Sequence, residues 1–157
     1  MLGGFHVVVS GVALVAVTLA GASTAAAQTP AADPAKPALL LDEGDAALIQ
    51  ILVKADKTAD FEVVLGKLKE ALQKSDKEIR RKQAAGWKAF KSTTPGPNGS
   101  VIYMMWIDPV VKGEEYAMSR LIFEVFPTES QEIFAKYKDA LVGQQTILLK
   151  TSLNMGQ

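Results

Sequence analysis

The chain has 157 residues, no cysteine and a single histidine, His6. Its 17 Lys and Arg residues balance 17 Asp and Glu residues, so net charge gives no reason to expect a nucleic-acid partner. The lack of cysteine excludes disulfides and thiolate chemistry. His6 falls in a predicted leader. Removal of the leader would leave the chain without histidine, the commonest general base and nitrogen metal ligand. We therefore expect neither a metal nor another cofactor.

The first 45 residues predict a leader and a spacer. An apolar run over residues 7–24 ends in Ala25-Ala26-Ala27 before Gln28, which is typical of a signal peptide over residues 1–27 and of export to a bacterial periplasm or the extracellular space. The run is also about long enough for an uncleaved membrane anchor, which is the alternative. Residues 28–45 are rich in Pro and Ala and predict a flexible linker. Residues 46–157 then form one domain.

The domain is predicted to begin with a strand and a helix. The short apolar run Ala46–Val53 indicates a buried strand. Thr58 can cap a following helix, whose apolar residues recur every three or four positions down to about Ser75. The charged residues Asp76–Lys82 either extend this helix or form a connection.

A hairpin follows. Gly86–Ser92 and Val101–Ile107 predict two antiparallel strands, joined by the turn-forming residues 93–99. The second strand is apolar at every position, so both of its faces are predicted to be buried. The chain's own helices can cover one face, and a second subunit is the simplest cover for the other. The sequence therefore predicts a homodimer.

The last third predicts two helices and a strand. The first helix spans about Glu115–Val125 and is ended by Pro127. Thr128 and Gln131 match a capping box for the second helix, and Gly143 is its expected end. Thr146–Leu153 is the expected final strand.

This order of elements predicts an α+β fold of the ferredoxin-like kind, an antiparallel sheet with helices on one face. With the hairpin GWKAFKS…SVIYMMWIDP, it resembles the dimeric α+β barrel superfamily, which includes antibiotic-biosynthesis-monooxygenase-like and haem-degrading domains. The stretch IYMMWIDPVVKGEEY…FEVFP also resembles uncharacterised exported bacterial proteins. The superfamily resemblance implies two sheets facing each other across a dimer. Haem-degrading members hold iron with a histidine, which the processed chain would lack, and no catalytic residue carries over by position.

Six residues are candidates for a site. Trp87, Tyr103, Met105 and Trp106 come from the hairpin strands and could line a ligand pocket, although core and dimer packing is the simpler interpretation. Gln50 is the one uncharged polar residue in the first strand and requires a hydrogen-bond partner if it is buried. Asp108 ends the aromatic strand and is a candidate for a catalytic base.

Basic residues are concentrated between Lys67 and Lys91. This segment holds nine basic and three acidic side chains, an excess of six positive charges, and its densest part is the predicted basic surface Lys77, Arg80, Arg81 and Lys82. An anionic lipid surface is one partner for such a cluster, and an ordinary solvated helix end is the simpler interpretation. The cluster lacks the interleaved aromatic residues that single-stranded nucleic acid requires.

The leading hypothesis is an exported homodimer without catalytic machinery that binds a small apolar or aromatic molecule or serves an accessory role. The first alternative is a cofactor-independent monooxygenase or isomerase that uses the aromatic strands and Asp108. The second is a structural envelope protein whose basic cluster contacts anionic lipid.

Overall fold

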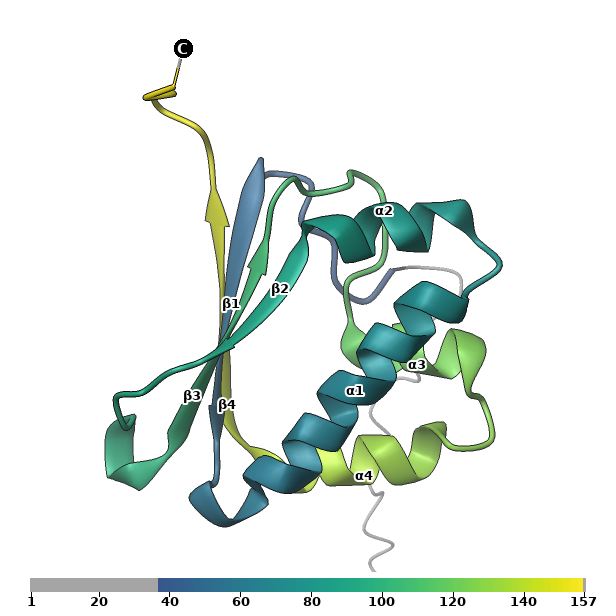
Figure 1. The fold of residues 1–157 in the computed structure, drawn as a ribbon, viewed down its shortest axis with the longest axis vertical. Coiled ribbons are helices and arrows are strands. Elements are labelled where there is room, and N and C mark those ends of the chain that lie inside the picture. Colours follow the sequence, from purple (N-terminus) through teal and green to yellow (C-terminus); the bar gives the residue numbers. More distant parts are fainter. Residues whose placement is uncertain (1–36, 157) are drawn as a thin grey trace, which may run out of the picture. The chain divides into compact units, whose positions relative to one another are not determined.

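The computed structural model describes residues 37–156, so the predicted leader and its anchor alternative lie outside the described residues. One antiparallel sheet has the strand order β2-β3-β1-β4, and the helices lie on one of its faces (Figure 1). The strands are β1 (Ala46–Val53), β2 (Trp87–Lys91), β3 (Val101–Ile107) and β4 (Leu141–Leu149). The helices are α1 (Thr58–Lys74), α2 (Glu78–Gly86), α3 (Met118–Val125) and α4 (Ser130–Ala140), with short 3-10 turns η1 (Ala55–Lys57) and η2 (Pro97–Gly99). This order and topology confirm the predicted ferredoxin-like α+β fold.

The core lies between the sheet and the helices. Side chains along a strand alternate between its two faces, and β1 accordingly alternates between buried and partly exposed positions. Ile49 and Ile51 of β1, with Tyr103 and Met105 of β3, face the helices and are buried. Phe61 of α1 packs on this layer, with its ring centroid 4.7 Å from that of Tyr103.

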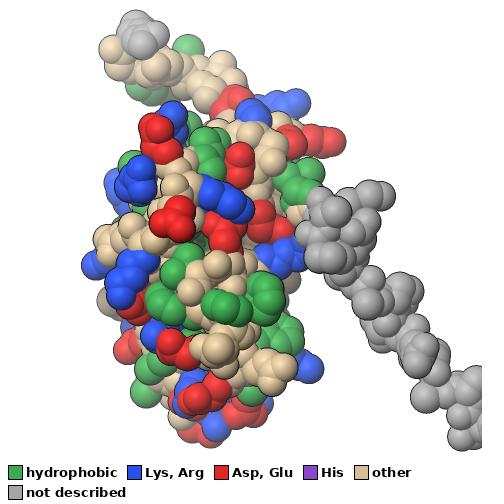
Figure 2. Space-filling view, turned by 90° about the vertical axis from the view of Figure 1, so that its right-hand side faces the viewer, with side chains coloured by type: hydrophobic (Ala, Val, Ile, Leu, Met, Phe, Trp, Pro, Cys, Tyr) green, Lys and Arg blue, Asp and Glu red, His purple; other side chains and the backbone are tan. Residues whose placement is uncertain are grey.

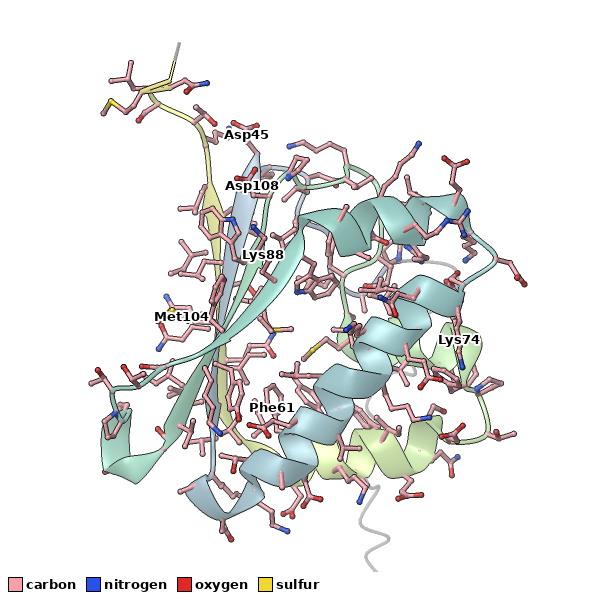
Figure 3. The ribbon with its side chains drawn as sticks, viewed as in Figure 1. Asp45, Phe61, Lys74, Lys88, Met104 and Asp108 are labelled. Carbon is pink, nitrogen blue, oxygen red and sulfur yellow. The ribbon has the colours of Figure 1, made fainter. Side chains whose placement is uncertain are left out.

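The opposite face of the sheet carries no second layer among residues 37–156. Figure 3 shows Met104 on this side and Phe61 between the sheet and α1. We call this side the open face, and it consists of Leu48, Gln50, Leu52, Lys88, Phe90, Ile102, Met104, Trp106, Gln145 and Ile147. Phe90 is 53 % exposed and Ile147 is 36 % exposed. The side chains of β3 on this face are only partly buried, so the prediction that both faces of this strand are covered stays a prediction for its open face.

The folded region begins before Ala46. Leu41 is fully buried in the core. The Glu115 carboxylate accepts hydrogen bonds from the backbone N–H groups of Ala38 at 2.6 Å and Leu39 at 3.0 Å. The backbone N–H of Tyr116 donates to the Leu39 carbonyl at 2.9 Å. The prediction of a flexible linker as far as Asp45 is therefore wrong for its last residues, which this carboxylate and the core hold in place.

Several predicted helix boundaries are also wrong. Residues 78–86 form a separate helix, α2, instead of extending α1 or connecting it to the hairpin. Helix α4 begins at Ser130 without a side-chain cap, so the predicted Thr128–Gln131 capping box does not form. Gly143 lies inside β4, where it pairs with Leu52, and this strand begins five residues before the predicted Thr146. Within residues 37–156 no helix is long and apolar enough to cross a membrane.

Candidate functional site

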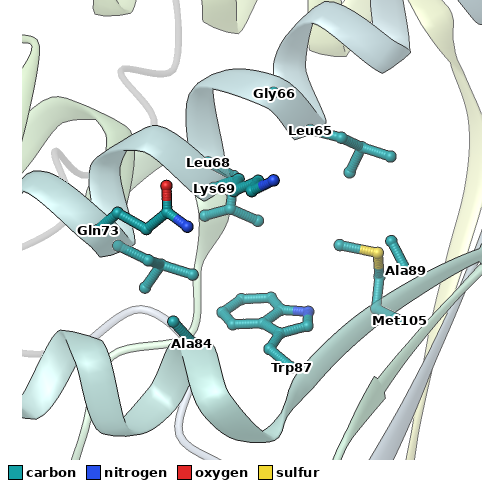
Figure 4. Close-up of a pocket in the computed structure, with 10 residues that line it drawn as sticks. Leu65, Gly66, Leu68, Lys69, Gln73, Ala84, Trp87, Ala89 and Met105 are labelled. Carbon is teal, nitrogen blue, oxygen red and sulfur yellow. The ribbon is translucent and has the colours of Figure 1, made fainter.

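A cleft of about 380 Å³ opens between α1 and the edge strand β2 (Figure 4). Helix α1 forms one wall, and Ala84 of α2 lies at one end. The floor is made by the two hairpin strands. The lining residues are Leu65, Gly66, Leu68, Lys69, Leu72 and Gln73 of α1, Ala84 of α2, Trp87 and Ala89 of β2, and Met105 of β3. This lining is mostly apolar, and Lys69 is the only charged residue among these ten.

Two small residues contribute to the space in the cleft. Gly66 lies in the middle of α1, and a Cβ atom built there would meet nothing within 4 Å. Ala89 faces the same space from β2, where most strand residues would fill more of it. Glycine inside a helix costs about 1 kcal/mol relative to alanine, and no close contact within the described residues requires it here. Gly66 was the one sequence feature that could have pointed to this wall.

Trp87 forms part of the cleft floor. Its indole ring packs on Tyr116, with the ring centroids 5.4 Å apart. The indole Nε1–H is buried and has no hydrogen-bond partner among residues 37–156, the only such side-chain atom in that part of the chain. Leaving a buried donor unpaired costs roughly 1–3 kcal/mol. Figure 4 shows this nitrogen on the side of the indole that faces Met105.

The wall behind the indole is not solidly packed. Trp87 and Met105 also line a second cavity of about 230 Å³, which Tyr116 and Met118 border from the helical layer. Methionine is unbranched and adapts readily to its surroundings. The unpaired Nε1–H therefore lies next to a side chain that has space to move.

Lys69 and Gln73 lie one helical turn apart at the mouth of the cleft. Both side chains are exposed, and neither forms an ion pair or hydrogen bond with any described residue. The other two lysines of α1 are both paired, Lys67 with Glu129 at 2.7 Å and Lys74 with Glu70 at 2.5 Å. Figure 4 shows the polar ends of Lys69 and Gln73 turned toward the space above the indole.

A polar cluster lies farther along the same two strands. The Tyr103 hydroxyl donates to Glu62 Oε1 at 2.7 Å, and the Lys91 ammonium donates to the same oxygen at 2.9 Å. The hydrogen bonds from Lys91 and then Tyr103 hold the pKa of Glu62 below its usual range. Burial, followed by the hydrogen bond to Glu62, raises the pKa of Tyr103. Tyr103 therefore remains a neutral donor whose hydroxyl is already engaged.

The structure divides the six candidate residues among four places. Trp87 and Met105 line the cleft, whereas Tyr103 belongs to the cluster with Glu62. Gln50 and Trp106 lie on the open face, separated from the cleft by the sheet itself. Asp108 is exposed at the end of β3, and Figure 3 shows it at the same end of the sheet as Asp45. The six residues therefore do not form one pocket.

The predicted basic surface is largely neutralised by acids. Arg80 is buried, with 6 % of its side chain exposed, and its guanidinium contacts Glu114 at 2.9 Å and Glu124 at 3.0 Å. Lys77 lies 2.7 Å from Glu124. The assignment of Arg80 to a basic surface is therefore wrong, because it holds α2 to neighbouring acidic residues. Figure 2 shows Lys and Arg side chains interspersed with Asp and Glu on the face that it presents.

Among the described residues, no three His, Cys, Asp or Glu side chains are grouped so that they could hold a metal ion. Comparison with protein-family models, with curated proteins and with solved structures finds no match. The functional argument therefore depends on the cleft itself.

Proposed function

We propose that this protein binds a small apolar or aromatic molecule in the cleft between α1 and β2. The observation that carries the proposal is the buried Trp87 Nε1–H, which has no partner among the described residues and lies beside an apolar cleft of about 380 Å³. Binding pockets for small molecules are typically of this size, with an apolar lining and a few polar groups that orient the ligand. A ligand that accepts a hydrogen bond from the indole would remove the cost of leaving that donor unpaired.

The expected ligand has a flat apolar body and a hydrogen-bond acceptor. The body would lie on the indole and against Leu65 and Leu68 of α1. The acceptor would meet Nε1–H when Met105 shifts into the second cavity.

The chemistry of the lining favours binding over catalysis. Lys69 is the only titratable side chain among the ten lining residues, and an acid–base pair is not present there. Asp108, the candidate base, does not line this cleft, and Trp106 lies on the other face of the sheet. We therefore place the cofactor-independent monooxygenase or isomerase second. The envelope hypothesis ranks third because the basic cluster on which it relied includes the buried, ion-paired Arg80.

The indole N–H resonances provide a direct test. The chain has two tryptophans, so the ¹H–¹⁵N spectrum shows two indole signals, which a Trp87→Phe variant assigns. Titration with a neutral probe, 2-naphthylacetamide, should shift the Trp87 signal. The Trp106 signal, from the opposite face, should stay in place.

A variant that fills the cleft provides the control. Ala89→Phe should abolish the shift, whereas Ala85→Phe, at an exposed position on α2 outside the cleft, should leave it unchanged. Equal shifts of both indole signals, or an unchanged shift in Ala89→Phe, would show that the probe binds elsewhere and would overturn the proposal.

We further propose that two copies pair through their open faces, as in the dimeric α+β barrel arrangement. The supporting observation is the row Trp106–Leu48–Ile147 across three neighbouring strands, which is apolar and uncovered within the described residues. Contiguous exposed apolar surface of this kind marks interaction sites. In a two-fold dimer the same patch of each subunit meets its copy, so the surface needs to complement only itself.

A further inference from the structure

We infer that the ligand of the cleft is an anion, an aryl or alkyl carboxylate whose charged group lies at the mouth beside Lys69. This inference rests on the proposed binding function and names the chemical class of the ligand. It depends on the distribution of charge and hydrogen-bond donors around the cleft.

Lys69 has an unpaired charge where its neighbours do not. Lys67 and Lys74 each lie within reach of Glu70, at 3.5 Å and 2.5 Å, whereas Lys69 has no carboxylate partner among residues 37–156. None of the ten residues that line the cleft is acidic. A cationic ligand would therefore meet only a like charge there, and an anionic one would meet an opposite charge.

The available hydrogen-bond donors point to the same class. The Lys69 ammonium, the Gln73 amide and the Trp87 Nε1–H are the three side-chain donors of the cleft, and none of them has a partner in the described chain. The lining supplies one acceptor, the amide oxygen of Gln73. A carboxylate has two acceptor oxygens and no donor, so it fits this set better than an alcohol or an amine.

The test compares two probes of the same shape that differ in charge, 2-naphthylacetate and 2-naphthylacetamide, by calorimetric titration of the full domain. The carboxylate should bind about fivefold more tightly, because a partly exposed ion pair contributes roughly that factor. The ratio of the two affinities should fall as the salt concentration rises. In Lys69→Met, which keeps an unbranched side chain but removes the charge, the two probes should bind equally.

Lys88→Met is the matched control. Lys88 also lacks an ion pair among the described residues, but it lies on the open face of β2, so its removal should leave the fivefold difference intact. Equal affinities in the unmodified protein, or a difference that survives Lys69→Met, would overturn the carboxylate inference while the cleft remains a binding site. Failure of both probes to bind would overturn the proposed function as well.

Discussion

At the scale of single residues, two small residues line the cleft, Gly66 in helix α1 and Ala89 in strand β2. At both positions a larger side chain would suit the secondary structure better. Gly66 interrupts an otherwise regular helical pattern, and no neighbour among residues 37–156 crowds it. A position at which a stability rule is broken without a structural reason is a candidate for function. The unpaired indole of Trp87 is a second such position, and the two lie on the same cleft.

Gly66→Ala should therefore stabilise the protein. The added methyl group meets open space, and alanine restricts the unfolded chain, so the free energy of unfolding should rise by about 1 kcal/mol in a urea titration. Gly86→Ala is the contrasting variant, because its Cβ would lie 2.9 Å from the Asp108 carbonyl oxygen, and it should destabilise. A loss of stability in Gly66→Ala would show that the glycine has a structural role that its surroundings do not reveal.

At the scale of elements, one carboxylate joins three segments of the helical layer. Glu124 of α3 accepts hydrogen bonds from Ser75 after α1, from Lys77 before α2 and from Arg80 within α2. Burial alone would raise the pKa of Glu124, but the hydrogen bonds from Arg80, Lys77 and Ser75 outweigh it and lower the pKa from 4.5 to about 2. The segment that the sequence presents as a basic surface is thus a junction between helices.

This junction should make folding pH-dependent. The pKa of Glu124 is lower in the folded chain than in the unfolded chain. Its contribution to the free energy of unfolding is therefore complete above pH 4.5 and is lost as the pH falls toward 2. The lowering corresponds to about 3 kcal/mol. Glu124→Gln should lower the free energy of unfolding by a similar amount at pH 7. It should also weaken the change of this free energy between pH 4.5 and 2, measured by urea unfolding at each pH. Glu78→Gln, at an exposed pair 3.6 Å from Lys82, should change little, and equal losses in both variants would contradict this account.

The elements with a clear hydrophobic period were predictable, and those that depend on tertiary contacts were not. The continuous apolar run of β1 and the three- and four-residue spacing of α1 follow from which side chains must be buried, so the sequence predicts the bounds of both nearly to the residue. The prediction that Gly143 ends the last helix is wrong, because glycine is common both at helix ends and at irregular positions in strands. Here it lies in β4, where the pairing shifts its register beside Leu52. The sequence predicts a linker around Leu41 because the burial of this side chain depends on a distant core that its Pro- and Ala-rich surroundings do not reveal.

The candidate site shows the same division. Trp87 and Met105 were accessible to sequence reasoning because aromatic and Met residues on strands are common pocket residues. The α1 wall was not, because Lys69 and Gln73 are ordinary exposed residues until the fold places them over the indole. Tyr103 and Trp106 do not share a pocket, because residues three apart on a strand point to opposite faces of the sheet.

At the scale of the whole molecule, the two faces of the sheet have separate roles in our proposal. The helix-covered face carries the core and the cleft, and the open face carries the subunit contact. Leu48 is the most informative position on the open face, because its neighbours Trp106 and Ile147 are both apolar. In a two-fold dimer of this kind, a charge at this position would be buried against the mostly apolar open face of the partner subunit and would lose its water.

In analytical ultracentrifugation the unmodified protein should sediment as a dimer, and Leu48→Glu should therefore sediment as a folded monomer. The matched control is Val63→Glu on α1, which introduces the same charge at an apolar residue that is 48 % exposed and lies outside the open face, and it should remain dimeric. Circular dichroism should show the same helix content in all three proteins. A dimer that survives Leu48→Glu would place the contact on another surface, and a monomeric unmodified protein would refute the pairing of open faces. In both cases the cleft proposal would stand, because the cleft is formed by residues of a single chain.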